Sequence, residues 1–153
     1  MVRTSVGAGP EDDEVVPYPS PSAAPRSVAA VSEPVHPGLY SPSGLIGGGC
    51  RGCGRRHFPR AVPCPWCGSD DVESVTLATT GTLWGWTAVT AAPPGYDGPV
   101  PYGFGVVELP DDGLRVVTRL ADADLDRLVE GMAMRFTVVA IGGDLETWAF
   151  TPA

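Results

Sequence analysis

The pattern of apolar and polar positions divides the chain into an amino-terminal stretch without periodicity and a longer part made of strands. Residues 1–43 mix proline, serine, alanine and glycine and show no apolar repeat. Such a segment buries too little apolar surface to offset the entropy lost when a chain is ordered. We therefore predict a disordered tail over residues 1–43.

The strand pattern starts at residue 72. Residues 72–79 alternate apolar with polar or small side chains, and β-branched and aromatic residues dominate 81–90, 103–109, 114–120, 134–141 and 145–151. Both features are typical of β-strands. Pro110-Asp111-Asp112-Gly113 has the composition of a tight turn, so residues 103–109 and 114–120 are expected to form a hairpin. The prolines and glycines of 92–99 predict a loop.

One short helix is predicted between the third and fourth of the five strands that begin at residue 81. It is expected over Asp122–Glu130, with Asp122 or Asp124 as its cap and Gly131 at its end. Three strands, a helix and two strands is the order of the OB-fold, a five-stranded Greek-key barrel. The prediction is a mainly β protein with an OB-fold over residues 72–153.

Between the tail and the barrel lie the only four cysteines, in two Cys-x-x-Cys pairs: Cys50, Cys53, Cys64 and Cys67. Two such pairs on hairpins can bring four thiolates to one tetrahedral zinc ion. Gly52 and Gly54 flank Cys53, and Gly68 follows Cys67. A backbone that curls its amides back towards metal-bound sulfurs needs conformations that glycine takes easily. This predicts a rubredoxin-like zinc ribbon over residues 44–71, with Zn²⁺ as a structural cofactor.

Other uses of the cysteines fit less well. Two disulfides would need an oxidising compartment, but the start of the chain lacks the basic-then-apolar order of a secretory signal. We therefore expect a cytoplasmic protein. A redox Cys-x-x-Cys usually comes as a single pair near a βαβ pattern. A catalytic zinc keeps an open coordination position, whereas four sulfurs close the shell.

Charge restricts the range of partners. The formal net charge is -8, which argues against a surface built to bind nucleic acid or an anionic membrane. No apolar run approaches the length of about 20 residues that spans a bilayer. All cationic side chains are arginines, and no acidic residue falls between the first and last cysteine. The ribbon is therefore a locally basic part of an acidic protein.

Together these motifs resemble the stand-alone zinc-ribbon plus OB-fold proteins known as domain of unknown function 35, or acyl-CoA-associated OB-fold proteins. The resemblance covers about residues 44–151. The Phe-Pro pair inside the ribbon loop, followed by Gly-Thr and Val-Glu-Leu, makes it more specific than the cysteines alone. The matching residues are Gly44, Cys50-x-x-Cys53-Gly54, Phe58-Pro59, Cys64-Pro65-x-Cys67-Gly68, Gly81-Thr82, Thr87, Pro99-x-x-Tyr102, Val107-Glu108-Leu109, Gly113 and Gly131-Met132.

The resemblance implies an accessory role. Members of this family pair with thiolase-superfamily enzymes in hetero-oligomers, including thiolases and the thiolase-like aldolases of steroid side-chain breakdown. They are not known as catalysts themselves, and they complete or shield the partner's acyl-CoA channel, so acyl-CoA is expected at or near the interface. The chain departs from the family in one place. Where members begin with an aromatic-containing helix, it has the proline-rich segment that ends at Val35–Tyr40.

Candidate binding residues in the ribbon follow from the phosphates of coenzyme A. Arginine offers a planar fork to phosphate oxygens, and a protonated histidine can assist. The alternative is a solvated basic surface that pairs with acidic groups of this chain or of a partner. The candidates are Arg51, Arg55, Arg56, His57, Phe58 and Arg60.

Candidates in the barrel are aromatic, because OB-folds bind ligands across their second and third strands and adjacent loops. Trp84, Trp86, Tyr96 and Tyr102 could stack on an adenine or anchor a partner. At least one of the two tryptophans is expected to face outward, and both share a face unless a bulge at Gly85 intervenes. Three further aromatic residues are expected in the core: Phe104, Phe136 and Trp148.

Catalytic motifs are missing from the sequence. His36 and His57 are the only histidines, and there is no Gly-x-Ser-x-Gly elbow, phosphate loop or His-Glu-x-x-His. The chain is therefore expected to have no catalytic residues of its own. The alternative to an accessory subunit is an OB-fold that binds single-stranded nucleic acid, which the acidic charge and the absence of lysine disfavour. An independent thioesterase would need residues that the sequence lacks.

Overall fold

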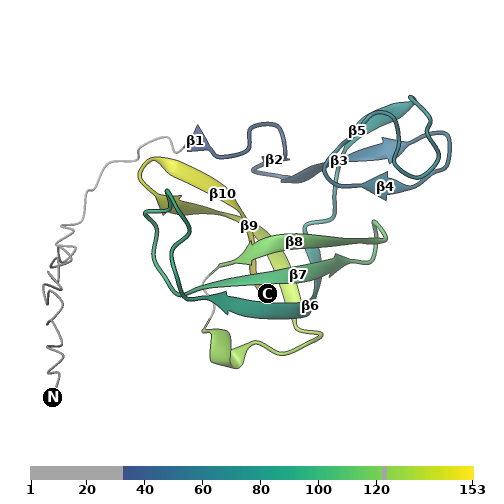
Figure 1. Cartoon of the computed structure of the whole chain (residues 1–153). Helices are drawn as coiled ribbons and strands as arrows, with labels where there is room; N and C mark the ends of the chain where they lie inside the picture. Colours follow the sequence, from purple (N-terminus) through teal and green to yellow (C-terminus); the bar gives the residue numbers. More distant parts are fainter. Residues whose placement is uncertain (1–32, 122–123) are drawn as a thin grey trace, which may run out of the picture.

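Two β-sheets make up the computed structural model, which describes residues 33–121 and 124–153. The larger sheet curls into a barrel, and the smaller one forms a ribbon that projects beside one end of that barrel (Figure 1). Residues 1–32 of the predicted tail lie outside the described residues.

The barrel is closed by five strands. β6 pairs with both β7 and β9, and β10 pairs with both β9 and β8, the last in a parallel arrangement. The fold class predicted from the sequence is thus confirmed, and each barrel strand lies within a few residues of its expected bounds. The strands are β6 (Thr80–Val89), β7 (Tyr102–Leu109), β8 (Leu114–Leu120), β9 (Ala133–Gly142) and β10 (Leu145–Pro152).

The β7–β8 hairpin has the predicted turn. Gly113 adopts a φ of 62°, and its N–H donates to the carbonyl of Pro110 at 3.2 Å. A left-handed residue at this place favours glycine because any Cβ would be strained there.

The helix predicted over Asp122–Glu130 is wrong in type and length. Among its described residues only one 3-10 turn forms, η1 (Leu125–Arg127), with the Asp124 side chain accepting from the Asp126 N–H. A short isolated segment gains few hydrogen bonds for the cost of nucleating a helix. Leu128 instead takes an extended conformation and is 4% exposed in the core, so burial of this side chain ends the turn.

The ribbon is built around β3 (Gly44–Cys50), with β4 (Arg56–His57) on one side and β5 (Val72–Thr76) on the other. β5 pairs with β3 from Ile46 opposite Thr76 to Cys50 opposite Val72. The sequence alone assigned residues 72–76 to the OB-fold. The sheet of the ribbon instead extends to Thr76, because an alternating strand pattern does not reveal which sheet a strand joins.

Residues 33–43 are structured, contrary to the predicted tail. β1 (Glu33–Pro34) pairs in parallel with β10, and β2 (Tyr40–Ser41) pairs with β3. The Tyr40 hydroxyl donates to the carbonyl of Glu146 at 3.1 Å, and its ring lies 5.8 Å from that of Trp148. These strands are too short to show periodicity, and contacts distant in sequence stabilise them.

One hydrophobic core serves both sheets. Leu45 of the ribbon strand and Leu77 of the following linker are 0% and 2% exposed, among the buried residues of the barrel. Of the aromatic residues expected in the core, Phe136 and Trp148 pack against it, whereas Phe104 is 41% exposed. The prediction for Phe104 is wrong because its glycine neighbours in β7 take the inward positions, where Leu120 and Leu125 fill the space.

Glycine in β3 is required by close packing. A Cβ at Gly48 would overlap the ring of His57, which is 4% exposed and lies opposite Gly48 in the β3–β4 pair. The His57 Nε2 also accepts from the Ala61 N–H at 3.1 Å. The imidazole thus occupies the space left by the missing side chain and holds the loop that follows β4.

Asp112 in the β7–β8 turn connects the barrel to the ribbon. Its side chain is fully buried, and it forms an ion pair with Arg56 of β4. Its second oxygen accepts from the Ala78 N–H at 2.6 Å, in the linker between β5 and β6. One carboxylate therefore joins the ribbon, the linker and the barrel hairpin.

Asp112→Ala is expected to destabilise the protein by about 3 kcal/mol, because Arg56 and the Ala78 N–H would both lose a buried partner. The measurement is the free energy of unfolding in urea. Asp111→Ala is the matched control, since Asp111 is exposed in the same turn and should change this free energy by less than about 0.5 kcal/mol. Equal effects of the two variants would contradict the role given to Asp112.

Candidate functional site

The four cysteine sulfurs converge as a metal site requires. All four Sγ atoms lie within 4.8 Å of one another. Cys50 and Cys67 are separated by 3.5 Å between sulfurs, and Cys53 and Cys64 by 3.9 Å. A tetrahedron with Zn–S bonds of about 2.3 Å has edges of about 3.8 Å, whereas a disulfide would need about 2.05 Å. The donor set and its spacing fit zinc.

Two similar turns carry the sulfurs. The Gly54 N–H donates to the Cys50 carbonyl at 2.8 Å, and the Gly68 N–H donates to the Cys64 carbonyl at 2.9 Å. Gly54 and Gly68 have positive φ, 72° and 74°, as expected of glycines beside the cysteines, whereas Gly52, the third glycine of that prediction, is not among the residues with positive φ. The repeated geometry presents two thiolates from each turn.

Electrostatics also favours a bound cation. The backbone N–H of Cys53 donates to the Cys50 sulfur and lowers the pKa of Cys50 to about 7. The Ser69 N–H acts in the same direction on Cys67, but the three neighbouring cysteines outweigh it and raise the pKa of Cys67 to about 12. Four adjacent thiolates repel one another, and a divalent cation at their centre removes that repulsion.

Most of the predicted cationic candidates in the ribbon are engaged within the chain. Arg51 pairs with Glu73 at 2.8 Å, which raises the pKa of the arginine, and Arg60 donates to the Val72 carbonyl at 2.9 Å. Arg56 pairs with Asp112, as described above. Only Arg55 is held by an aromatic surface, with its Cζ 5.2 Å from the Trp66 ring centroid.

The other two ribbon candidates have packing roles. His57 is buried against β3 and does not present its ring to solvent. Phe58 is half-buried, with its ring 5.9 Å from that of Trp148 in an edge-on arrangement. The structure therefore distributes the six ribbon candidates around the sheet instead of gathering them into one phosphate site.

A cavity of about 460 Å³ lies between the ribbon and the β7–β8 turn. Arg55, Arg56 and Trp66 line its ribbon side, and residues 111–113 line its barrel side. Arg55 is the cation in this lining without a carboxylate partner among the described residues. It is the ribbon side chain best placed to meet an anion.

Both barrel tryptophans are exposed, Trp84 by 49% and Trp86 by 38%, which confirms that at least one faces outward. The pairing of β6 with β7 shifts in register between Leu83 and Gly85. This is the bulge at Gly85 that the sequence had left open. Because of it, Trp86 lies opposite Gly105, while Trp84 is stacked under Arg115 with the Arg115 Cζ 4.5 Å from its ring centroid. The two rings therefore do not share one binding surface.

The predicted tyrosines do come together, around a residue that the sequence did not single out. The rings of Tyr96 and Tyr102 lie 5.3 Å apart. Arg119 of β8 donates through Nη1 to the Tyr96 hydroxyl at 2.8 Å, and its Cζ lies 4.0 Å from the Tyr102 ring centroid. The sequence did contain one indication of Arg119: it lies four residues after Arg115, a spacing that puts both arginines on the same face of one strand.

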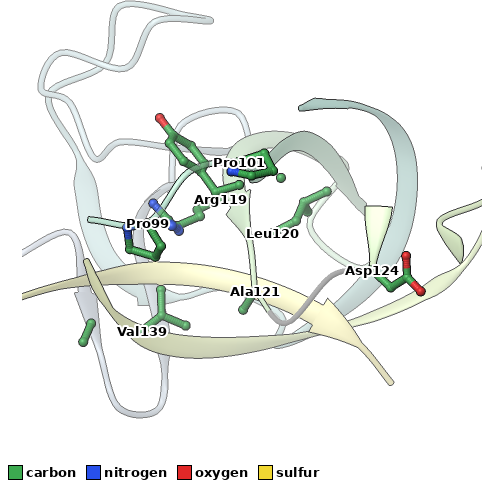
Figure 2. Close-up of a pocket in the computed structure, with 10 residues that line it drawn as sticks. Pro99, Pro101, Arg119, Leu120, Ala121, Asp124 and Val139 are labelled. Carbon is green, nitrogen blue, oxygen red and sulfur yellow. The ribbon is translucent and has the colours of Figure 1, made fainter. Parts of the chain in front are cut away.

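Arg119 contributes to two hollows. The first, of about 500 Å³, lies between the prolines of the β6–β7 loop, the end of β8 and strand β9 (Figure 2). The second, of about 300 Å³, runs over the outer barrel face between His36 and Phe104, with Trp148 at its side. Within residues 33–121 and 124–153, no helix is long and apolar enough to cross a bilayer.

Comparison with known families accounts for both parts of the chain. Residues 44–73 match the model described as the ChsH2 rubredoxin-like zinc ribbon domain, and residues 74–139 match that of the ChsH2 C-terminal OB-fold domain. The chain belongs to the ChsH2 family of zinc-ribbon and OB-fold proteins. Its four cysteines are accordingly the ligands of a structural zinc ion, as the sequence predicted.

Two curated relatives are named as a scaffold protein and as a thiolase subunit. A DUF35 domain-containing scaffold protein of Pyrococcus furiosus is 35% identical over 88 residues, covering 58% of this chain and 63% of the relative. The benzoylsuccinyl-CoA thiolase subunit BbsA of Thauera aromatica is 34% identical over 79 residues, or 52% of this chain and 53% of that subunit. The chain thus spans less than two thirds of these curated relatives.

A solved structure has the same fold. A chain of the Ltp2-ChsH2(DUF35) aldolase aligns with a TM-score of 0.60 and 29% sequence identity, over 71% of this chain and 84% of the solved one. The likeness covers most of that chain and includes more than a shared barrel.

Cys64→Ser is expected to abolish zinc binding and to loosen the ribbon while the barrel stays folded, because three thiolates leave the shell open. The measurements are zinc content and hydrogen exchange, in which the amides of Gly54 and Gly68 should lose protection. Ser69→Ala is the control, since it keeps the Ser69 N–H near Cys67 and should retain the ion. Stoichiometric zinc in Cys64→Ser would contradict the four-sulfur site.

Proposed function

We propose that this chain is a non-catalytic accessory subunit of a thiolase-superfamily enzyme. The observation that carries the proposal is the paired zinc ribbon and OB-fold, shared at 29% identity with a chain of the Ltp2-ChsH2 aldolase. The relatives named as a scaffold protein and as a thiolase subunit point in the same direction. We expect a hetero-oligomer with a thiolase or a thiolase-like aldolase, in the cytoplasm.

The described residues support a role without catalysis. The zinc shell is closed by four sulfurs, so it has no open position for a substrate. His57 is buried and hydrogen-bonded to the Ala61 backbone. Glu108 and Asp112 are paired with Arg115 and Arg56. None of these contacts joins a histidine to a hydroxyl or thiol, the arrangement that an activated nucleophile needs.

The outer barrel face supplies the proposed partner contact. Phe104 of β7 and Val117 of β8 are 41% and 55% exposed, and they border the groove that also includes Tyr102 and Trp148. Exposed apolar side chains gathered on one face are typical of interaction sites, and aromatic residues often anchor them. His36 lines the same groove, so the segment between β1 and β2 lies at the proposed contact.

Arg55 is the proposed contact to the acyl-CoA of the partner. It lines the cavity between ribbon and barrel, and its guanidinium has no carboxylate partner among the described residues. A planar fork at the rim of an active-site channel suits the phosphates of coenzyme A. A thiolase-like aldolase of steroid side-chain breakdown is the partner that we would test first.

Co-expression with a thiolase-like protein tests the proposal. We expect a stoichiometric complex whose acyl-CoA activity falls when this chain is omitted. Phe104→Ala should weaken the complex by roughly tenfold or more, since an exposed aromatic anchor is lost. Val129→Ala is the control, because Val129 is similarly exposed but follows η1. Retention of the chain on single-stranded DNA at physiological salt, without a protein partner, would overturn the proposal.

Arg55→Ala in the assembled enzyme should raise the KM for acyl-CoA by roughly tenfold with little change in kcat. A phosphate contact is made equally in the ground and transition states, so its loss affects binding alone. Steady-state kinetics of the complex provide the measurement. Arg127→Ala, at the exposed end of η1, is the matched loss of one arginine and should leave both constants unchanged. A fall in kcat at constant KM would contradict the proposed contact between Arg55 and the phosphates of acyl-CoA.

A further inference from the structure

Two arginines on the outer face of β8 are stacked on aromatic rings but differ in charge compensation. Arg115 lies over Trp84 at 4.5 Å and pairs with Glu108 at 3.0 Å. Arg119 lies over Tyr102 at 4.0 Å and donates to the neutral hydroxyl of Tyr96. Among the ion pairs of the described residues, Arg119 takes part in none. One of two similarly held cations is therefore left without an anion.

The guanidinium of Arg119 has donors to spare. It carries five N–H groups, and one of them is accounted for by the Tyr96 hydroxyl. The stacked ring of Tyr102 holds the plane of the group without using its donors. A fixed, uncompensated fork of this kind is suited to an oxyanion.

Arg119 faces the larger of the barrel hollows. The side chain lies beside Pro99 and Pro101, and the carboxylate of Asp124 stands at the opposite end (Figure 2). The other labelled side chains of this lining, Leu120, Ala121 and Val139, are aliphatic (Figure 2). The volume of about 500 Å³ is within the range of small-molecule sites.

The walls of this cavity are held in place before any ligand arrives. The Tyr96 hydroxyl accepts from Arg119 and donates to the Pro99 carbonyl at 3.1 Å, so the arginine and the proline loop are fixed together. Gly98 packs so closely on the backbone of Ile141 that a Cβ there would overlap it. A preformed site loses little entropy on binding.

We propose that this cavity binds a ligand with one oxyanion on a small apolar body, with the oxyanion on Arg119. Asp124 would repel a second anionic group, so the site selects ligands with a single charged end. A carboxylate and a phosphate monoester share the required chemistry. The lining of this cavity comes from this chain and includes none of the ribbon arginines.

Nuclear magnetic resonance titration of the isolated, zinc-loaded chain tests the proposal. The probes are pentanoate and butyl phosphate, which distinguish the two sources of the oxyanion. At least one of them should shift the amides of Gly103 and Ala121 with saturation. Arg119→Met should bind that probe about tenfold more weakly or worse, because a charge-assisted pair is lost. Arg115→Met removes the stacked but compensated arginine and should bind like the unaltered chain.

Selection against a second charge gives an independent readout. Glutarate has the same chain length as pentanoate but a second carboxylate, so it should bind more weakly than pentanoate. Asp124→Asn removes the repelling charge and should reduce the difference in affinity between the two ligands. If Arg119→Met fails to fold, Arg119→Lys replaces it in the test. Lysine keeps the positive charge but lacks the planar guanidinium, so this variant should still bind the probe more weakly. The proposal is overturned if neither probe shifts the cavity amides, if Arg119 and Arg115 variants bind alike, or if Asp124→Asn does not favour glutarate.

Discussion

The buried carboxylate of Asp112 is the interaction on which the arrangement of the two sheets depends. It can hold Arg56 only because β4 is kept beside β3, and β4 is held there by the turn that carries Cys50 and Cys53. Zinc thus acts on the barrel through a short chain of contacts, from the metal-bound turn to Arg56 and on to the β7–β8 turn. A closed metal shell offers no chemistry, but it determines where the basic side chains of the ribbon stand.

The single hydrophobic core explains why the two parts form one body. β3 is a seven-residue strand that places Leu45, its second residue, among the barrel residues and its last residue, Cys50, in the metal site. Glycine within that strand admits the His57 ring, so the ribbon packs tightly although its own buried cluster consists of Cys50, Cys64 and Val72. A domain boundary drawn between ribbon and barrel therefore cuts through shared contacts. Loss of the metal should be felt at the Leu45 end of the strand as well.

The features that could be predicted from the sequence are those that depend on neighbouring residues in the chain. The cysteine pairs, the Gly113 turn and the barrel strands depend on residues close together in the chain, and their patterns are specific. What escaped prediction depends on distant partners. Tyr40 is ordered by Trp148, Leu128 leaves a helical conformation to enter the core, and Phe104 faces outward because Leu120 fills the space beside Gly103. Arg119 was overlooked for the same reason, since nothing in its own strand shows that two tyrosines surround it.

The partners that the arginines find in the fold change the assignment of anion-binding sites that the sequence suggested. The sequence drew attention to the ribbon, where four arginines stand without a nearby acid in the chain. In the fold, acidic residues and a carbonyl from other segments occupy Arg51, Arg56 and Arg60. Among the described residues, Arg55 keeps an uncompensated guanidinium beside the ribbon cavity, and Arg119 on the barrel is a second one, which is also held by a hydrogen bond to Tyr96. A basic cluster in sequence therefore indicates an anion site only when its charges remain uncompensated after folding. Of the four ribbon arginines, Arg55 alone has neither a carboxylate nor a carbonyl partner among the described residues.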